Sequence, residues 1–371
     1  MRIAWLTYSF LEYSAFHVNE LSLQHDVLFV VPSEPTVLTD DAVADRVEWF
    51  AFHKPRFRQP IKQIAKIREI LHRIDEFQPD VVHVQQGHLW FNFVLGRLRR
   101  RYPLVITIHD PRHHLGDKAS KKTPQWVMDL GFRQADQVIV HGQQLKDQVV
   151  SLFGFSQSSV HVIPHISMGG EPELAAELNT EQPVEDLIVL FFGRIWDYKG
   201  LEYLIQAQPI IRESIPNAKV LIAGTGDDFA RYEAMMQDHD GFIVHNHWIS
   251  NEQRDALFRR AALVVLPYRE ATQSGVVPVA YGYSKPVVAS DVGALSECVA
   301  HEETGLLVPS CDSNALAQAI IRLLKDEPLR RRYGQAGYQR LQQLSSPACV
   351  AAETANVYQQ AIAQRAKAGE V

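Results

Sequence analysis

Two short stretches of the sequence carry side chains that suit the binding of a negatively charged group. The first, FFGRIWDYKG at residues 191–200, ends an apolar run and then offers Arg194 and Lys199 next to glycines. Glycine lets backbone amides approach a ligand closely, and a helix expected from residue 201 would add the positive end of its dipole. Two cations in this setting predict a clamp for a diphosphate. A pair of surface cations is the simpler alternative, because the five-residue spacing is not specific by itself.

The second stretch, LPYREATQSGVV at residues 266–277, also follows an apolar run and leads into a predicted helix. The first amides of a helix have no partner within the helix, and together with the helix dipole they attract a phosphate. Glu270 does not suit a phosphate, but its carboxylate accepts hydrogen bonds from sugar hydroxyls. An ordinary role in capping the helix is the alternative for this residue. The turn residues that we expect at the phosphate are Gln273, Ser274, Gly275 and Val276.

A parallel sheet would bring both stretches to one edge. Short apolar runs of strand length alternate with longer helical patterns along the chain. Runs rich in Val, Ile and Leu, separated by helices, are typical of parallel strands buried on both faces. We therefore predict a doubly wound α/β fold, in which ligands bind where the carboxyl ends of the strands open into loops. The predicted strands are RIAWL, DVLFVV, DVVHV, PLVITI, QVIV and VHVI in the first half, and LIVLFF, KVLIA, GFIV, ALVVL, PVVA and GLLVP in the second.

The length of the chain and its local composition predict two such domains. A chain of 371 residues exceeds the usual size of a single core. Residues 167–186 are rich in Gly, Pro and Glu and lack a long apolar run, which is typical of an interdomain linker. We predict a first Rossmann-like domain over residues 1–165, a hinge over 166–185, a second domain over 186–345 and a terminal helix over 346–371.

The overall composition argues against several classes of protein. Hydrophobic residues make up 46% and charged residues 22%, as in compact globular proteins. The net charge of -6 argues against a general nucleic-acid binder. The three cysteines form no CxxC pair, which argues against a disulfide framework or a zinc site. Because we find no signal peptide and no apolar run of membrane-spanning length, we expect a cytoplasmic protein.

Positive charge is concentrated in the first half of the chain. Residues 1–165 hold 19 Lys and Arg against 17 Asp and Glu, whereas the remainder holds 18 against 26. Residues 53–73 alone contain seven cations and one glutamate. This basic segment favours an acidic partner or a peripheral contact with the inner membrane, and a solvated helix face is the alternative.

The order of the motifs along nearly the whole chain resembles the retaining GT-B glycosyltransferases of the family-four, or group 1, type. The resemblance implies two Rossmann-like domains that face a central cleft, with the acceptor on the first, the donor on the second, and a C-terminal helix packed back on the first. It implies a metal-independent hexosyltransferase that uses a nucleoside diphosphate sugar and needs no cofactor. In that family the cations of the GRxxxxKG element, here Arg194 and Lys199, bind the donor diphosphate. Further shared elements are DVVH at 80–83, ITIHD at 106–110, VHVIPH at 160–165, AGTGDD at 223–228 and PVVASDVGALSE at 286–297.

The resemblance also assigns roles to residues outside the two stretches. His109 matches a histidine that contacts the transferred sugar, and the neighbouring Asp110 would support it. Trp248 and Ile249 fall where the nucleobase binds, and packing in the core is the alternative for both. A metal site at the histidines around residue 109 is set aside because the family needs no ion. The residues that we assign to catalysis are His109, Arg194, Lys199 and Glu270.

Two departures from the family pattern leave other functions open. The second carboxylate that usually holds the ribose would fall near Val279, and Ser9, Ser14 and Ala15 stand where many members have a glycine-rich loop. A transferase-like binding or regulatory subunit is therefore one alternative, and a sugar-nucleotide epimerase or a phosphorylase of the same fold is another. Acceptors in the family are polysaccharides, glycolipids and small molecules, and the basic segment favours a lipid-linked acceptor.

Overall fold

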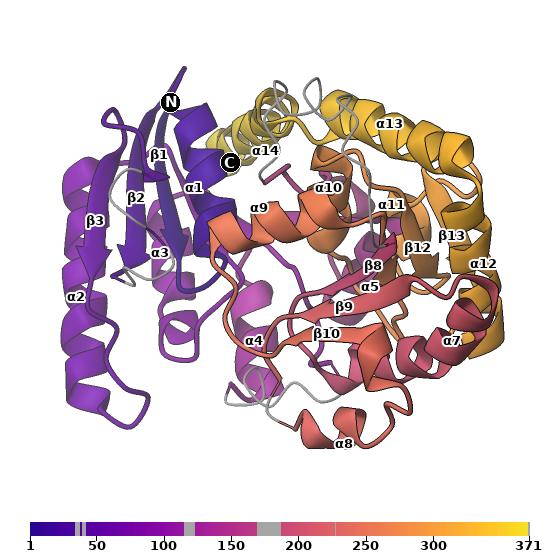
Figure 1. Cartoon of the computed structure of the whole chain (residues 1–371). Helices are drawn as coiled ribbons and strands as arrows, with labels where there is room; N and C mark the ends of the chain where they lie inside the picture. Colours follow the sequence, from indigo (N-terminus) through magenta and orange to yellow (C-terminus); the bar gives the residue numbers. More distant parts are fainter. Residues whose placement is uncertain (34–37, 39–41, 115–122, 169–186, 227, 370–371) are drawn as a thin grey trace. The chain divides into compact units, whose positions relative to one another are not determined.

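The computed structural model describes residues 1–371 except 34–37, 39–41, 115–122, 169–186, 227 and 370–371 (Figure 1). The chain divides into two compact units. The first contains residues 1–113, 118–166 and 346–371, and the second contains residues 114–117 and 167–345. Most of the predicted hinge, from residue 169 to residue 185, lies outside the described residues.

A seven-stranded sheet forms the centre of the first unit, and all of its strands are parallel. The strand order is β3-β2-β1-β4-β5-β6-β7, so the direction of winding reverses between β1 and β4. The apolar runs of the sequence predict each of these strands except β3, which lies at the sheet edge and has four of its five residues at least partly exposed. The strands are β1 (Arg2–Thr7), β2 (Asp26–Pro32), β3 (Glu48–Phe52), β4 (Val81–Gln85), β5 (Leu104–Thr107), β6 (Gln137–Val140) and β7 (Val160–Val162).

A second parallel sheet, of six strands, forms the centre of the second unit. Its order is β10-β9-β8-β11-β12-β13, and each strand matches a predicted apolar run. The two sheets confirm the predicted class of two doubly wound α/β domains. The strands are β8 (Leu187–Phe192), β9 (Ala218–Ala223), β10 (Phe242–His245), β11 (Leu263–Leu266), β12 (Val287–Ser290) and β13 (Gly305–Val308).

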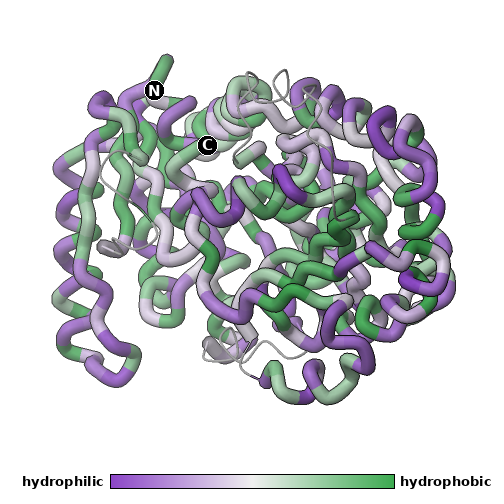
Figure 2. Tube along the Cα trace, viewed as in Figure 1, coloured by the Kyte–Doolittle hydropathy of each residue, from purple (hydrophilic) through white to green (hydrophobic). Residues whose placement is uncertain are grey.

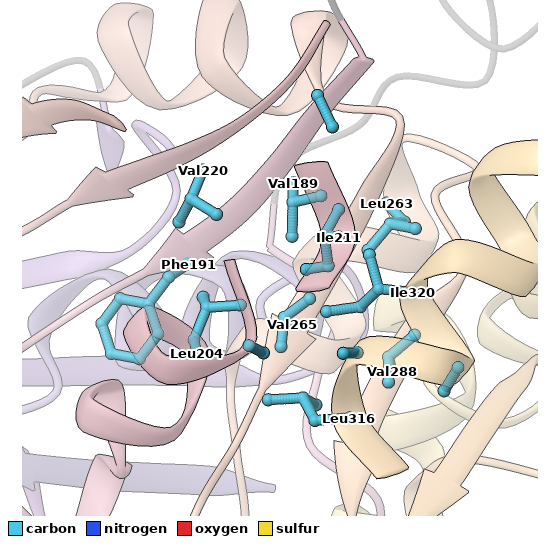
Figure 3. Close-up of a cluster of buried hydrophobic side chains, with 14 of the residues drawn as sticks. Val189, Phe191, Leu204, Ile211, Val220, Leu263, Val265, Val288, Leu316 and Ile320 are labelled. Carbon is cyan, nitrogen blue, oxygen red and sulfur yellow. The ribbon is translucent and has the colours of Figure 1, made fainter. Parts of the chain in front are cut away.

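Helices cover the second sheet and bury apolar side chains against it. They are α7 (Leu201–Ser214), α8 (Ala230–Glu233), α9 (Asn251–Arg260), α10 (Val276–Gly282), α11 (Leu295–Cys298), α12 (Ser313–Lys325) and α13 (Glu327–Leu344). On one face Val189 and Phe191 of β8 pack with Leu204 and Ile211 of α7 and with Ile320 of α12 (Figure 3). Each of these side chains is at most 1% exposed. Burial of one such side chain stabilises the fold by about 1.5–3 kcal/mol.

The helices of the first unit come from both ends of the chain. They are α1 (Leu11–Leu21), α2 (Pro60–Phe77), α3 (Leu95–Arg101), α4 (Gln125–Phe132), α5 (Gln143–Phe153) and α14 (Pro347–Gly369). In Figure 2 the strands are mostly hydrophobic, whereas α2 is mostly hydrophilic. This pattern is expected for helices that bury only one face against a sheet.

The C-terminal helix α14 packs within the first unit, against α1 and the strands β4, β5 and β6. Tyr358 is fully buried, and its hydroxyl forms a hydrogen bond with Nδ1 of His83 on β4. Arg365 donates hydrogen bonds to the backbone carbonyls of Arg99 and Arg100. These contacts tie the last helix to the middle of the first sheet.

Among the described residues of the first unit, six histidines are buried, each at most 9% exposed: His17, His83, His88, His109, His141 and His165. Ring centroids are 4.8 Å apart for His109 and His141 and 5.3 Å apart for His141 and His165. Burial lowers the pKa of His17, His88 and His165 to about 3 and that of His141 to about 4. The same cause holds the pKa of His83 and His109 well below the usual range. All six imidazoles are therefore neutral at pH 7.

We expect the stability of the first unit to fall in mild acid. Because these pKa values are lower in the folded state, the unfolded chain binds more protons below about pH 6.5, and stability is lost as the pH falls. Between pH 7.5 and 5.5, His17, His141 and His165 together should lower the free energy of unfolding by about 4 kcal/mol. Urea unfolding curves recorded across this range measure the loss.

His141→Gln is the test variant for this dependence, because its side-chain amide can replace the Nδ1 donor that bonds the Ile163 carbonyl at 2.9 Å. It should reduce the proton uptake on unfolding by about one proton at pH 5.5. His72→Gln is the control, since the His72 side chain is 75% exposed. If the free energy of unfolding depended on pH equally in both variants and the parent, the assignment of proton uptake to His141 would be contradicted.

Candidate active site

The two stretches with candidate phosphate ligands lie next to each other in the second unit. The first follows β8 and the second follows β11, and these strands are neighbours in the sheet. Gly200, with φ of 63°, holds the two loops together, because a Cβ atom there would lie 2.0 Å from the carbonyl oxygen of Pro267. Only glycine fits both this conformation and this close approach.

Lys199 is buried, with 8% of its surface exposed, and ends the short 3-10 helix η5 (Asp197–Lys199) just before α7. Its Nζ donates a hydrogen bond to the hydroxyl of Tyr268 and lies 4.1 Å from the centroid of that ring. A lysine is seldom buried unless other groups replace its solvent. The phenol does so here in two ways, through its oxygen and through its π face.

Tyr268 extends this contact to the turn before α10. Its hydroxyl lies 3.3 Å from Ser274 Oγ, which also accepts a hydrogen bond of 3.3 Å from the Val276 amide. Burial raises the pKa of Tyr268, so the phenol stays protonated at neutral pH. The sequence analysis missed Tyr268, although a hydroxyl-bearing side chain directly after a predicted strand was a signal for it. The structure thus joins Lys199 to the turn residues through one side chain.

Arg194 lies on the loop after β8 and is exposed. Its guanidinium stacks over the ring of Trp196, with Cζ 4.1 Å from the ring centroid. Its positive charge also acts to lower the pKa of Tyr268, which places both cations near the same phenol. The loop after β9 packs closely against this loop, because a Cβ atom on Gly224 would lie 1.9 Å from the Gly193 carbonyl oxygen.

Glu270 lies in the loop after β11, with a side chain that is 41% exposed. Farther along, Gln273 has a buried Oε1 that lacks a hydrogen-bond partner among the described residues. Helix α10 then begins at Val276 and spans seven residues. The predicted turn is therefore present, but the Val276 amide already donates a hydrogen bond to Ser274 Oγ.

Trp248 and Ile249 lie on the loop after β10, which is separated from β8 by β9. The Trp248 side chain is 64% exposed, whereas Ile249 packs against a buried core cluster. Asn246 Oδ1 accepts a hydrogen bond of 2.9 Å from the Gly226 amide and so ties this loop to the loop after β9. Of the two residues predicted at the nucleobase, only Trp248 has the exposure that stacking requires.

His109 lies in the first unit, just after β5, and its side chain is fully buried. Its Nε2 lies 2.8 Å from Gln85 Oε1, and its ring stacks on Phe10 with centroids 3.9 Å apart. Its Nδ1 is buried without a hydrogen-bond partner among the described residues. The side chain of Gln86 holds the backbone of His109 and Asp110. Its Oε1 accepts a hydrogen bond of 2.9 Å from the His109 amide, and its Nε2 donates one of 3.1 Å to the Asp110 carbonyl.

Comparison with known proteins gives matches to both units. The family model described as Glycosyl transferases group 1 matches residues 186–326, and the model described as Glycosyltransferase Family 4 matches residues 18–166. The chain belongs to this glycosyltransferase family. The described part of the chain contains no helix that is both long and apolar enough to cross a membrane.

Relatives and solved structures agree with this family. A glycosyltransferase of Methanocaldococcus jannaschii is 29% identical over 295 residues, which is 75% of each chain. The sucrose-phosphate synthase of Thermosynechococcus elongatus has a TM-score of 0.75 at 22% identity, covering 98% of this chain and 100% of that one. Anabaena HepE in complex with UDP and glucose has a TM-score of 0.74 at 17% identity, covering 97% and 100%. The fold is GT-B.

Removal of the Tyr268 hydroxyl should impair glycosyl transfer more than stability. Tyr268→Phe keeps the ring under Lys199 but removes the acceptor for Nζ and the link to Ser274. We expect kcat/KM to fall about 10-fold to 100-fold, the effect of a lost hydrogen bond worth about 1–3 kcal/mol. Steady-state kinetics and a thermal melt on the same preparation measure the two effects.

Tyr281→Phe is the matched control, because Tyr281 is equally buried and its hydroxyl bonds Thr304 Oγ1 at 2.6 Å. It should lower the melting temperature about as much as Tyr268→Phe while leaving kcat/KM close to that of the parent. If both variants lost activity equally, Tyr268 would have only a structural role.

Proposed function

We propose that the protein is a metal-independent, retaining hexosyltransferase that moves a hexose from a nucleoside diphosphate sugar to an acceptor hydroxyl. The observation that carries the proposal is the buried Lys199, held by Tyr268 near the exposed Arg194 at the carboxyl edge of the second sheet. Two cations at this edge suit a diphosphate, and this edge is where α/β sheets bind ligands. Membership of the glycosyltransferase family supports a diphosphate sugar as the ligand.

The leaving group gains charge as the bond between the sugar and the diphosphate breaks. Arg194 and Lys199 would stabilise that charge, and each fixed donor of this kind is worth about 3 kcal/mol. Ser274 would add a third donor. Its Oγ accepts from the Val276 amide and lies next to the Tyr268 hydroxyl, so its own proton is available to a phosphate oxygen. These groups stabilise charge without a divalent cation.

The sugar and the acceptor need different groups. Glu270 would accept hydrogen bonds from sugar hydroxyls, and His109 with Asp110 would orient the sugar from the first unit. The acceptor oxygen attacks the anomeric carbon on the face that the diphosphate leaves, and its proton passes to a phosphate oxygen of the leaving group. This route gives retention without a covalent intermediate, unlike a retaining glycosidase, which forms one on a carboxylate.

A transferase-like binding subunit is the second candidate, and one observation favours it. Val279, at the position of the usual ribose carboxylate, is 4% exposed and packs in the core with Ala280. Calorimetry with nucleoside diphosphates separates the candidates when it is followed by a turnover assay. Binding without transfer or hydrolysis of any donor would support the subunit.

A panel of UDP, GDP and ADP sugars, assayed in EDTA, tests the reaction itself. Because HepE was crystallised with UDP and glucose, UDP-glucose is the first donor to test. We expect donor hydrolysis or transfer at an unchanged rate in EDTA, because the fixed cations replace a metal. Nuclear magnetic resonance of the product should show the anomeric configuration of the donor. Inversion, or full loss of activity in EDTA, would overturn the mechanism.

Removal of either cation should slow transfer strongly. We expect kcat to fall about 100-fold or more in Arg194→Ala and in Lys199→Met, because each loses a donor to the growing charge. Methionine keeps the volume beside Tyr268, so a loss of activity would not come from a cavity. Arg269→Ala is the control. Arg269 directly follows Tyr268, but its Nη1 lies 3.7 Å from Glu202 Oε1, so its charge is paired with that carboxylate. Full activity of both folded test variants would refute the clamp.

A further inference from the structure

Large apolar side chains are exposed on three helical segments of the first unit. These segments are α2, the short 3-10 helix η2 (Phe91–Phe93) and α4. The exposed fractions are 82% for Ile61, 47% for Ile64, 50% for Phe93 and 61% for Trp126. We call these four residues the apolar patch. Exposed apolar side chains that gather on one surface mark a binding face.

The topology of the first sheet brings the apolar patch to one edge. Helix α2 follows β3, η2 follows β4 and α4 follows β5, and these strands are parallel, so all three segments begin at the carboxyl edge. Direct contacts join neighbouring segments. Trp90 Nε1 donates to the Phe57 carbonyl at 3.2 Å, and the rings of Phe93 and Trp126 lie 5.9 Å apart.

Exposed cations accompany the apolar patch. They are Arg56, Arg58, Lys62, Arg68 and Arg97. Within the described ranges none of these five side chains forms an ion pair, whereas Lys66 and Arg112 pair with Glu69 and Asp129. The edge therefore presents apolar groups together with uncompensated positive charge.

We infer that this edge of the first unit binds the surface of an anionic membrane. Isoleucine, phenylalanine and tryptophan side chains enter the boundary between headgroups and acyl chains, and tryptophan prefers that boundary. Lysine and arginine beside them meet the anionic headgroups. A second copy of the chain fits less well, because a symmetric contact would place the same five cations opposite one another.

The inference also names the class of acceptor, and this part rests on the proposed function. His109, the residue proposed at the sugar, follows β5 at the same carboxyl edge as the apolar patch. An acceptor at this edge would lie close to the membrane surface when the edge is bound there. The acceptor is therefore a lipid with a hydroxyl in its headgroup region.

Sedimentation of the full chain with lipid vesicles tests the membrane surface without any donor. We expect binding to phosphatidylcholine vesicles that contain phosphatidylglycerol, weaker binding to phosphatidylcholine alone, and a loss of binding when salt is raised. Ile61→Ser with Trp126→Ser should weaken binding about 10-fold or more, because two large side chains no longer enter the lipid. Arg58→Glu with Lys62→Glu should weaken it by a similar factor.

Two control variants come from the opposite edge of the same sheet. Leu23 is 53% exposed and lies between α1 and β2, and Arg100 is exposed in the last turn of α3. Leu23→Ser and Arg100→Glu should bind vesicles as the parent does. Equal losses in the control and the patch variants would overturn the inference, as would absence of vesicle binding at low salt. Self-association that the patch variants abolish would assign the edge to a second copy instead.

The outcomes of this experiment and of the turnover assay are independent. Transfer to a soluble acceptor without vesicle binding would reject the membrane surface and leave the proposed function intact. Vesicle binding without donor turnover would reject the proposed function and leave the membrane surface intact. If the protein binds vesicles and is active, faster transfer to a hydroxyl-bearing lipid in vesicles than to its soluble headgroup is the result expected for a lipid acceptor.

Discussion

A buried ammonium group beside a phenol organises the candidate donor site. Burial of a charge costs several kcal/mol unless nearby groups replace the lost water. Tyr268 replaces part of that water for Lys199, and the Gly200–Pro267 contact brings the two loops close enough for it to do so. A cation kept partly out of water also attracts an anion more strongly than a fully solvated one. The contact thus links the packing of two strands to the strength with which Lys199 would attract an anion.

The two units use similar sheets to present different electrostatics. Below the carboxyl edge of the first sheet, burial keeps His109, His141 and His165 neutral, so these rings add polar atoms without charge. At the same edge of the second sheet, Arg194 and Lys199 supply fixed positive charge. Neutral imidazoles can bond hydroxyl groups, whereas fixed cations suit a diphosphate.

The sequence predicted the fold well because runs of buried β-branched residues mark inner parallel strands. Strand β3 escaped this rule because Trp49 and Phe50 lie at a half-exposed edge. The sequence also predicted a cationic pair at Arg194 and Lys199, but the burial of Lys199 depends on how β8 and β11 pair, which local spacing does not encode. The hydrogen bond between Lys199 and Tyr268 depends on the same pairing. The full burial of His109 likewise depends on Phe10, which is nearly a hundred residues away in the chain.

The place of α14 has a consequence for the order of folding during synthesis. Domains usually fold as units, with the N-terminal one first, as the chain leaves the ribosome. Here the first unit lacks its Tyr358 contact to His83 until residues 347–369 have been made, by which time the whole second unit is available to fold. The unit that begins the chain is therefore completed last, and its partly formed core has to stay free of aggregation in the meantime.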